Sequence, residues 1–269
     1  MSKAVIENVT LAQQEYVAGQ IRRRQLVRAA RTLILAVILI LWEICARAGF
    51  INDFIFSSPS RIAMAVAAMA ADKSIFYHTG ITILETIVSF GLVTVAGITG
   101  AVLLWSSESF AEILDPYLVM LNSLPKSALA PILIVWLGAN MRTIIVAAVS
   151  VAVFGSILTL YNGFSNIDPD QEKLIFSLGG NRRDVLVKLL LPGSVPMIVS
   201  NMKVNVGLCL VGVIIGEFLA ARAGLGYLII YGSQVFQLTT VMTAIMILCV
   251  LSAVMYRGIG ILEQRLNRK

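Results

Sequence analysis

The sequence predicts an all-α, polytopic membrane protein in which six transmembrane helices form one membrane domain. Apolar residues make up 58% of the 269 positions and charged residues 13%, and the mean hydropathy is +0.87. A soluble domain carries about 25% charged residues, so this chain has too few polar residues to cover a water-facing surface. The net charge of +6 does not indicate nucleic-acid binding, because the basic residues lie at the ends of apolar runs. We therefore expect membrane lipid around the chain and no nucleic acid.

A polar segment, residues 1–31, precedes the first apolar run and ends in clustered arginines. A cleaved signal peptide is not expected, because the polar lead is long and no small-x-small cleavage site follows the apolar stretch. We expect a cytoplasmic segment over 1–31 and a first transmembrane helix over 32–50. Glu43 and Arg47 interrupt that helix four residues apart, so their side chains lie on one face and can form an ion pair.

The next elements are a short helix and two further spans. The helix over 61–71 is too short for a bilayer core of about 30 Å, which needs about 20 residues, so we expect it at the outer surface. Span two covers 79–105, and only Glu85 interrupts its apolar character. Span three covers 115–137 and is expected to be bent or broken, because prolines remove backbone hydrogen bonds. Its prolines are Pro116, Pro125 and Pro131.

Three more spans complete the predicted bundle, over residues 143–160, 195–219 and 238–255. Span five carries Gly212 and Gly216, a spacing that lets two helix backbones approach closely. Lys203 and Glu217 lie near the ends of the same span, where we expect them to face water or lipid head groups. Segment 220–236 holds three glycines and is expected to fold back into the outer face of the protein.

The basic residues predict on which side of the membrane each loop lies. Fourteen of the 21 Lys and Arg residues precede span one, separate spans four and five, or follow span six, whereas five lie in the opposite loops. Cytoplasmic loops carry the excess of Lys and Arg. We therefore expect both termini and the loop 163–193 in the cytoplasm, which makes 32–269 a transmembrane domain with one large cytoplasmic loop.

The loop 163–193 predicts two short amphipathic helices that meet at a glycine corner. Asp168 and Pro169 suit the start of the first helix, and Gly179–Gly180 suits its end. Asn181 can cap the second helix, and Leu191-Pro192 is expected to end it. Apolar residues share one side of each helix: these are Leu174, Ile175 and Leu178 on the first and Val185, Leu186 and Leu189 on the second.

Two arginines, Arg182 and Arg183, begin the second helix, where the helix dipole disfavours positive charge. Something other than helix stability therefore accounts for their position. Two explanations stay open: contact with anionic lipid head groups, or a soluble partner that docks on the loop.

The loop also carries a helix, a glycine and a distal Leu-Pro, with Ser177-Leu178-Gly179, Arg182 and Leu191-Pro192 at the matching positions. This pattern resembles the coupling loop of binding-protein-dependent ABC importer permeases. Residues 216–220 (GEFLA) and 224–229 (GLGYLI) resemble the nitrate/sulfonate/taurine group of that family, and the resemblance runs from about residue 33 to 266.

One position departs from the family signature, which begins with Glu-Ala-Ala. That triplet falls here on Lys173-Leu174-Ile175, so its acidic residue is missing. Glu172 lies one position earlier, about 100° around a helix. It therefore cannot make the same contact without rotation of the helix.

The resemblance implies a type I ABC importer permease fold. It further implies a permease subunit that moves a small polar or anionic solute, such as a sulfonate, taurine, nitrate or a related compound, into the cytoplasm. The implied partners are ABC ATPase subunits, which carry ATP and Mg, an extracytoplasmic solute-binding protein and a second permease copy; this chain is expected to bind no cofactor. The residues expected to couple the loop to the ATPase are Glu172, Lys173, Leu174, Ile175, Ser177, Leu178, Gly179, Gly180, Arg182, Arg183, Leu191 and Pro192.

No motif for enzymatic chemistry is present in the sequence. It has no P-loop, no HExxH and no GxSxG, and its three cysteines lie in apolar runs without metal-ligand spacing. The single histidine, His78, is expected to pack at the membrane boundary. We therefore expect neither an enzyme nor a metal site.

Ionisable and polar residues inside the spans are candidates for the translocation pathway. An ion-coupled secondary transporter is the alternative, but it predicts inverted repeats and several midplane carboxylates, whereas the sequence offers one deep acid. For that acid, Glu85, the simplest explanation is that it snorkels to the membrane surface or forms an ion pair with a basic residue of a neighbouring helix. The candidate pathway residues are Glu85, Asn122, Ser123, Pro125, Pro131, Asn205 and Glu217.

Overall fold

The computed structural model describes residues 11–266, in which helices are connected by short loops and no strand is present. The predicted cytoplasmic segment 1–31 lies partly outside these residues, and so do the last two basic residues, Arg268 and Lys269. The chain divides into two compact units after Met64. Five helices of the described chain are long and apolar enough to cross a membrane, or six if one bent helix pair counts as a span. The predicted all-α class is confirmed.

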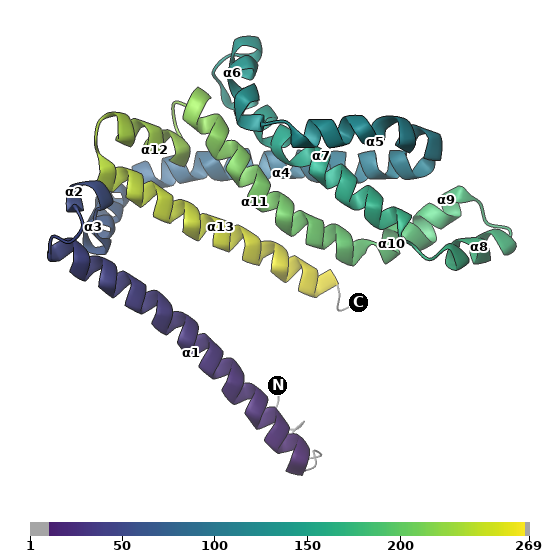
Figure 1. Cartoon of the computed structure of the whole chain (residues 1–269), viewed down its shortest axis with the longest axis horizontal. Helices are drawn as coiled ribbons and strands as arrows, with labels where there is room; N and C mark the ends of the chain where they lie inside the picture. The colour runs from purple at the N-terminus through teal and green to yellow at the C-terminus, as the bar shows by residue number, and fades with distance from the viewer. Residues whose placement is uncertain (1–10, 267–269) are drawn as a thin grey trace. The chain divides into compact units, whose positions relative to one another are not determined.

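The first unit contains α1 (Leu11–Arg47), α2 (Asp53–Phe56) and the start of α3 (Pro59–Ala71). Helix α1 begins at Leu11, well before the expected start at residue 32, so the clustered arginines lie on a helix that continues into the first apolar run (Figure 1). The ion pair between Glu43 and Arg47 is confirmed, with 2.6 Å between Oε1 and Nε.

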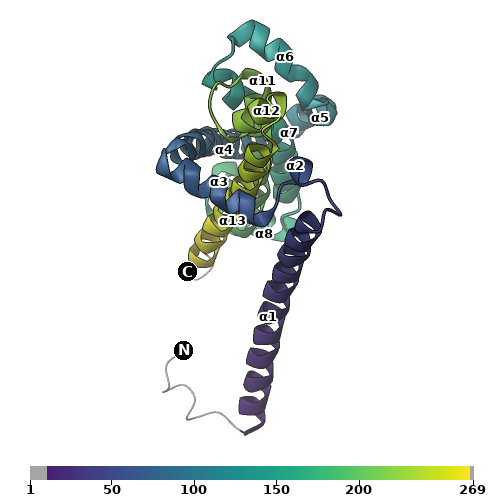
Figure 2. The ribbon, with the colours of Figure 1, turned by 90° about the vertical axis from the view of Figure 1, so that its left-hand side faces the viewer.

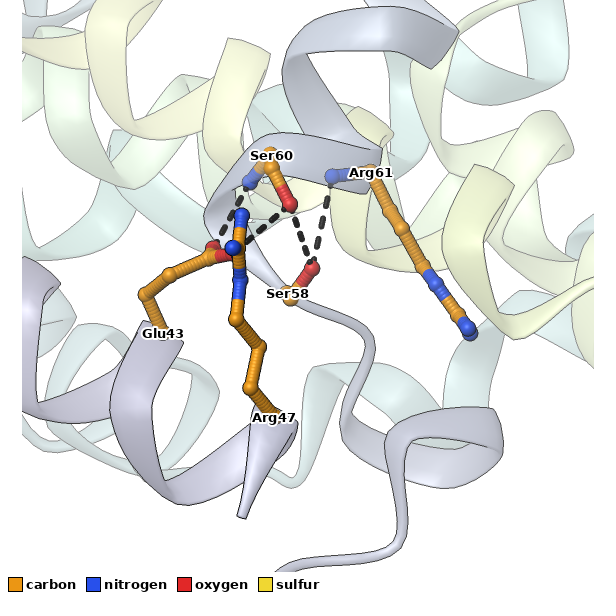
Figure 3. Close-up of polar contacts among 5 residues, drawn as sticks. All are labelled: Glu43, Arg47, Ser58, Ser60 and Arg61. Carbon is orange, nitrogen blue, oxygen red and sulfur yellow. Dashed lines mark hydrogen bonds and ion pairs between the residues drawn. The ribbon is translucent and has the colours of Figure 1, made fainter. Parts of the chain in front are cut away.

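The carboxylate of Glu43 also receives hydrogen bonds from the start of α3. Ser60 donates its backbone N–H at 3.0 Å and its hydroxyl at 2.9 Å, while Ser58 Oγ accepts the N–H of Arg61 at 3.4 Å. Figure 3 shows Arg47 and Ser60 meeting at this carboxylate, with the Arg61 side chain turned away from it. A carboxylate is favourable at a helix N-terminus because the dipole there is positive. One acid therefore ties α1 to α3.

The second unit is built around three long helices that lie side by side: α4 (Ser74–Ser106), α7 (Met141–Ser165) and α11 (Val195–Ala220). Helix α13 (Leu238–Leu266) packs on α11. A short helix, α12 (Leu225–Gln234), connects α11 to α13 and packs on α4, α11 and α13 (Figure 1). The short folded-back segment predicted over 220–236 therefore corresponds to α12.

The predicted break in span three is confirmed. Helices α5 (Glu108–Ser123) and α6 (Lys126–Leu137) meet at 92°, and α6 turns away from the rest of the unit in both views (Figure 1, Figure 2). The break falls at Leu124 and Pro125, because the residue before a proline is driven into extended backbone; Leu124 has φ −62° and ψ 140°. Pro116 and Pro131 lie inside their helices without breaking them.

The close approach predicted for Gly212 and Gly216 is also confirmed. A Cβ atom on Gly212 would lie 2.6 Å from the Cα of Ala148, and one on Gly216 would lie 3.0 Å from the Cα of Ile144. Helices α7 and α11 therefore touch along their backbones, as small residues permit.

Candidate functional site: the loop between α7 and α11

The first helix of the loop, α8 (Pro169–Ser177), has the predicted limits. Asp168 accepts the N–H of Asp170 at 2.9 Å, which caps the helix start. At the other end, Gly179 N–H bonds to Phe176 O and Gly180 N–H to Ile175 O, the bond pattern of a Schellman motif. Gly179 has φ +83°, a conformation that L side chains rarely adopt. The predicted glycine corner is therefore confirmed.

The second helix begins at α9 (Arg182–Asp184) with the predicted cap. Asn181 Oδ1 accepts the N–H groups of Arg183 and Asp184, and Asp184 Oδ2 accepts the N–H of Asn181 at 2.9 Å. These reciprocal bonds form a capping box. Lys188, whose Nζ lies 2.7 Å from Asp184 Oδ1, and the Asn181 N–H hold the pKa of Asp184 below its usual range.

The second helix ends at Gly193, one residue beyond the predicted Leu191-Pro192. It runs through a π-helical segment, Val185–Leu190, and α10 (Leu191–Gly193), and Ser194 separates it from α11. Ser194 N–H bonds to Leu190 O and Ile198 N–H to Ser194 O, both at 2.9 Å, so two hydrogen bonds of helical spacing bridge this residue. Proline has no N–H and its ring crowds the carbonyl four residues earlier. The wider π turn just before Pro192 accommodates the proline within the last turn of the helix.

The two helices of the loop bury their apolar sides to very different extents. Val185 and Leu190 are each 1% exposed, and Leu190 packs in a core cluster with Leu160 and Phe164 of α7. At the first helix, by contrast, Leu174 of α8 and Leu178, which caps its end, are 58% and 79% exposed. The second helix is therefore anchored to the bundle, while α8 presents apolar side chains to its surroundings.

The remaining loop residues lie around this exposed side. Lys173 pairs with Asp170 at 2.8 Å, and Ser177 donates to Leu174 O. Glu172, Ile175, Gly180 and Leu191 are partly buried, while Pro192 is exposed. The position that lacks the family's acidic residue is thus held by a lysine that is already paired within its own helix.

Arg182 makes a contact that the sequence analysis missed. Its guanidinium carbon lies 5.4 Å from the ring centroid of Trp105, at the end of α4, and its Nη2 donates to the Trp105 carbonyl at 3.5 Å. Neither of the two explanations for Arg182 and Arg183 included a partner within the chain. The signal was an aromatic residue at the expected cytoplasmic end of span two, on the same side of the membrane as the loop.

The pathway candidates fall into separate places in the structure. Asn122, Ser123, Pro125 and Pro131 are all exposed at or near the α5–α6 break. Asn205, in contrast, is buried where α11 meets α7, and its amide donates to Ser156 Oγ at 2.9 Å. The first four therefore lie at an exposed helix break, whereas Asn205 lies in a buried contact between two helices.

The two acids, Glu85 and Glu217, are buried against each other. They are 2% and 1% exposed, and their carboxyl groups share a hydrogen bond. Two predictions are therefore wrong: Glu217 does not face water or head groups, and Glu85 pairs with an acid instead of a base. A bond between two carboxyl groups needs a proton on one of them.

The start of α12 supplies the remaining partners of Glu217. Its carboxylate accepts bonds from the N–H groups of Gly226 and Tyr227 and, at 2.7 Å, from Thr82 Oγ1. Thr82 Oγ1 in turn accepts Leu225 N–H at 2.9 Å. Since Glu217 is the acceptor in all three, Glu85 is the partner that carries the shared proton. We name Thr82, Glu85 and Glu217, with the first amides of α12, the carboxyl cluster.

Two further observations complete the surroundings of the carboxyl cluster. Gly224 N–H donates to His78 Nδ1 at 3.0 Å, and the His78 ring stacks on Tyr227, so this histidine packs as the sequence suggested but also caps α12. Glu85 borders an open cavity of about 270 Å³ that Arg222 and Asn140 also line.

Comparison with known proteins identifies the family. Residues 93–268 match the family described as "Binding-protein-dependent transport system inner membrane component". The chain belongs to this family. It is a multi-pass inner-membrane permease of an ABC importer, as the sequence resemblance predicted.

Individual relatives agree with this assignment. A probable ABC transporter permease protein of Haemophilus influenzae is 29% identical over 87% of this chain and 94% of its own length. The formylaminopyrimidine transport permease protein ThiX of Halalkalibacterium halodurans is 27% identical over 73% of this chain and 78% of its own. Other matches bear the names of aliphatic-sulfonate, taurine and nitrate permeases.

A solved structure gives the same fold. The MetNI methionine ABC transporter, in an inward-facing conformation, matches 69% of this chain and 93% of its own with a TM-score of 0.62 and 19% identity. This likeness shows the fold alone, and it confirms the predicted importer permease architecture.

Proposed function

We propose that this permease passes a small polar or anionic solute from an extracytoplasmic binding protein to the cytoplasm, driven by separate ABC ATPase subunits that dock on loop 163–193. ATP and Mg belong to the ATPase, and the permease contributes no cofactor. Two copies of the chain form the pathway, and both termini lie in the cytoplasm, as the distribution of Lys and Arg favours.

One observation carries this proposal: α8 exposes an apolar side next to a helix that leads into α11 across a single residue, Ser194. Leu174 and Leu178 are exposed while Val185 and Leu190 are anchored in the bundle. A partner that covers α8 can therefore move α11 through α10 and the hydrogen bonds that bridge Ser194. Rigid-body rocking of packed helices is a common form of such transitions.

The α5–α6 break supports a second permease copy. Asn122, Ser123 and Pro125 lie exposed at this break, and irregular backbone at membrane depth is tolerated only where protein or cavity water satisfies it. A second copy across this surface, with a water-filled pathway between the two, meets that requirement.

The relatives favour the substrate class. Permeases named for aliphatic sulfonates, taurine, nitrate and a formylaminopyrimidine are similar over 59–87% of this chain, so a small polar or anionic solute is the proposed cargo. A thermal-shift panel of these compounds on the cognate binding protein tests the class. A binding protein that recognises only a large apolar ligand would contradict it.

The docking assignment is tested with Gly179→Val. The new side chain has open space around it, but φ +83° is strained for valine, so the corner between α8 and α9 is expected to deform. The ATPase should no longer co-purify with the permease, while membrane insertion is retained.

Gly258→Ala on α13 is the matched control, because that glycine also has open space but no positive φ. Vesicles reconstituted with all subunits should take up solute only with ATP. Uptake driven by an ion gradient without any ATPase, or normal ATPase binding by Gly179→Val, would refute the proposed function.

A further inference from the structure

The contact between Arg182 and Trp105 joins loop 163–193 to the end of α4. Trp105 is in the last turn of α4, which ends at Ser106. The final carbonyls of a helix lack partners within the helix and carry its negative dipole end. Here the Leu104 carbonyl receives the Ser107 N–H, and the Trp105 carbonyl receives Arg182. The guanidinium therefore meets both the ring and the negative end of α4.

The capping box fixes the position of the Arg182 backbone at the start of α9. Arg182 follows Asn181 directly, inside the capping box that Asn181 and Asp184 form. An arginine in this first turn is unfavourable for its own helix. Its favourable partner is the end of another helix, where a positive charge is stabilising. The same residue is thus poorly placed for α9 and well placed for α4.

Helix α4 connects this contact to the carboxyl cluster. Thr82 and Glu85 lie on α4 and hold Glu217 of α11 and the first amides of α12. Trp105 lies 23 positions after Thr82, which corresponds to roughly 35 Å at 1.5 Å per residue. Helix α4 also packs on α7. A displacement at Trp105 is therefore carried by a stiff helix to the start of α12.

We propose that Arg182 is a positioning residue that couples loop 163–193 to α4, so that loop movement reaches the carboxyl cluster as well as α11. This inference rests on the proposed function, because it concerns how docking of the ATPase is transmitted. A direct route runs from α10 into α11; the Arg182–Trp105 contact adds a second route through α4.

Arginine suits this role better than lysine. A planar guanidinium can stack on an indole ring and still donate hydrogen bonds from its edge, whereas an ammonium group is a point charge. Arg183, the next residue, is exposed and has no ring contact among the described residues. The chain thus offers a matched arginine for comparison.

The test measures how strongly the binding protein stimulates ATP hydrolysis by the reconstituted transporter. Stimulation requires that binding of the binding protein on one side of the permease is transmitted to the ATPase on the other side. The measurement needs no labelled solute. Arg182→Gln and Trp105→Leu are each expected to lower the stimulation about 2- to 5-fold, the range of an exposed cation–π contact. The double variant should lose no more than either single variant, because both changes remove one contact.

Arg183→Gln is the control for charge. Combined with Trp105→Leu, its effect should be additive, since the two residues are not in contact. Trp105→Phe keeps a ring and should retain more stimulation than Trp105→Leu. The ATPase should co-purify with both Trp105 variants, because Trp105 lies on α4, outside loop 163–193.

Unchanged stimulation in Trp105→Leu, or additive losses in the Arg182–Trp105 pair, would overturn the inference. Loss of ATPase co-purification in Arg182→Gln alone would show that Arg182 contacts the ATPase instead of α4. Either result leaves the docking assignment intact, because Gly179→Val tests that assignment separately.

Discussion

The carboxyl cluster and loop 163–193 share two features, a capped helix start and glycines beside it. The first lies buried in the protein and the second lies at its surface. At the start of α12 the capping carboxylate comes from another helix, and Glu217 is 1% exposed. At α8 and α9 the caps are local, and Leu178 is 79% exposed. In the first region the helix amides find their acceptors within the chain, whereas the second exposes apolar side chains. Burial of the cap therefore distinguishes a contact made within the chain from the proposed docking surface.

The largest difference is expected between two glycines with positive φ. Gly224→Ala combines a backbone conformation at φ +119° with a Cβ that would lie 2.3 Å from Glu217 Oε1. Strain and overpacking together should lower the free energy of unfolding by about 4 kcal/mol. Gly179→Ala meets open space and should cost only about 1 kcal/mol. Thermal unfolding of both purified variants measures the difference, and equal losses would refute the contrast.

A second difference is expected between the two acids. In Glu217→Gln an amide NH2 replaces a carboxylate oxygen that accepts hydrogen bonds. Buried N–H groups then lose an acceptor, which should lower the free energy of unfolding by about 3 kcal/mol. Glu85→Gln keeps a donor toward Glu217 and should cost less than about 1 kcal/mol. Unfolding midpoints in detergent report both values.

The assignment of the shared proton to Glu85 depends on this asymmetry. If Glu85→Gln destabilises the permease as much as Glu217→Gln, the proton does not reside on Glu85. Thr82→Val is a useful companion, because it removes one donor to Glu217 and one acceptor for Leu225. Its cost should fall between those of the two acid variants.

The sequence predicted the features that depend on neighbouring residues. The start and end of α8, the Asn181 cap, the proline break and the Glu43–Arg47 pair all involve residues within five positions of each other. Composition and charge distribution predicted the membrane class for the same reason, since neither depends on which helices meet.

The residue pairs that the sequence analysis missed depend on which helices meet. Glu85 contacts Glu217 across more than 130 positions, and Arg182 contacts Trp105 across 77. Periodicity and spacing do not predict such pairs, because they identify the face of a helix and not its partner. The one-residue offset at Pro192 has another origin: the π turn over Val185–Leu190, buried at both ends, carries the helix past the proline to Gly193.

The smallest expected effect concerns the pH dependence of the capping box. Hydrogen bonds from Lys188 and Asn181 hold the pKa of Asp184 below its usual range, so the folded loop binds its proton less readily than the unfolded loop. The stabilising contribution of Asp184 is therefore complete above the ordinary aspartate pKa of about 3.9. It is lost as the pH falls through the lower pKa of the folded state.

Trp105 fluorescence reports this change, because the backbone of Arg182 lies in the capping box and its side chain contacts the Trp105 ring. Trp42 and Trp136 are replaced by phenylalanine so that the emission comes from Trp105. As the pH falls below the ordinary aspartate pKa of about 3.9, the emission should shift as the box opens. In Asp184→Asn the shifted emission should already be present at pH 6, and the same fall in pH should change it little. Identical titrations of the two proteins would show that the capping box does not hold Arg182 on α4, and the α4 route from the loop would then lack its anchor.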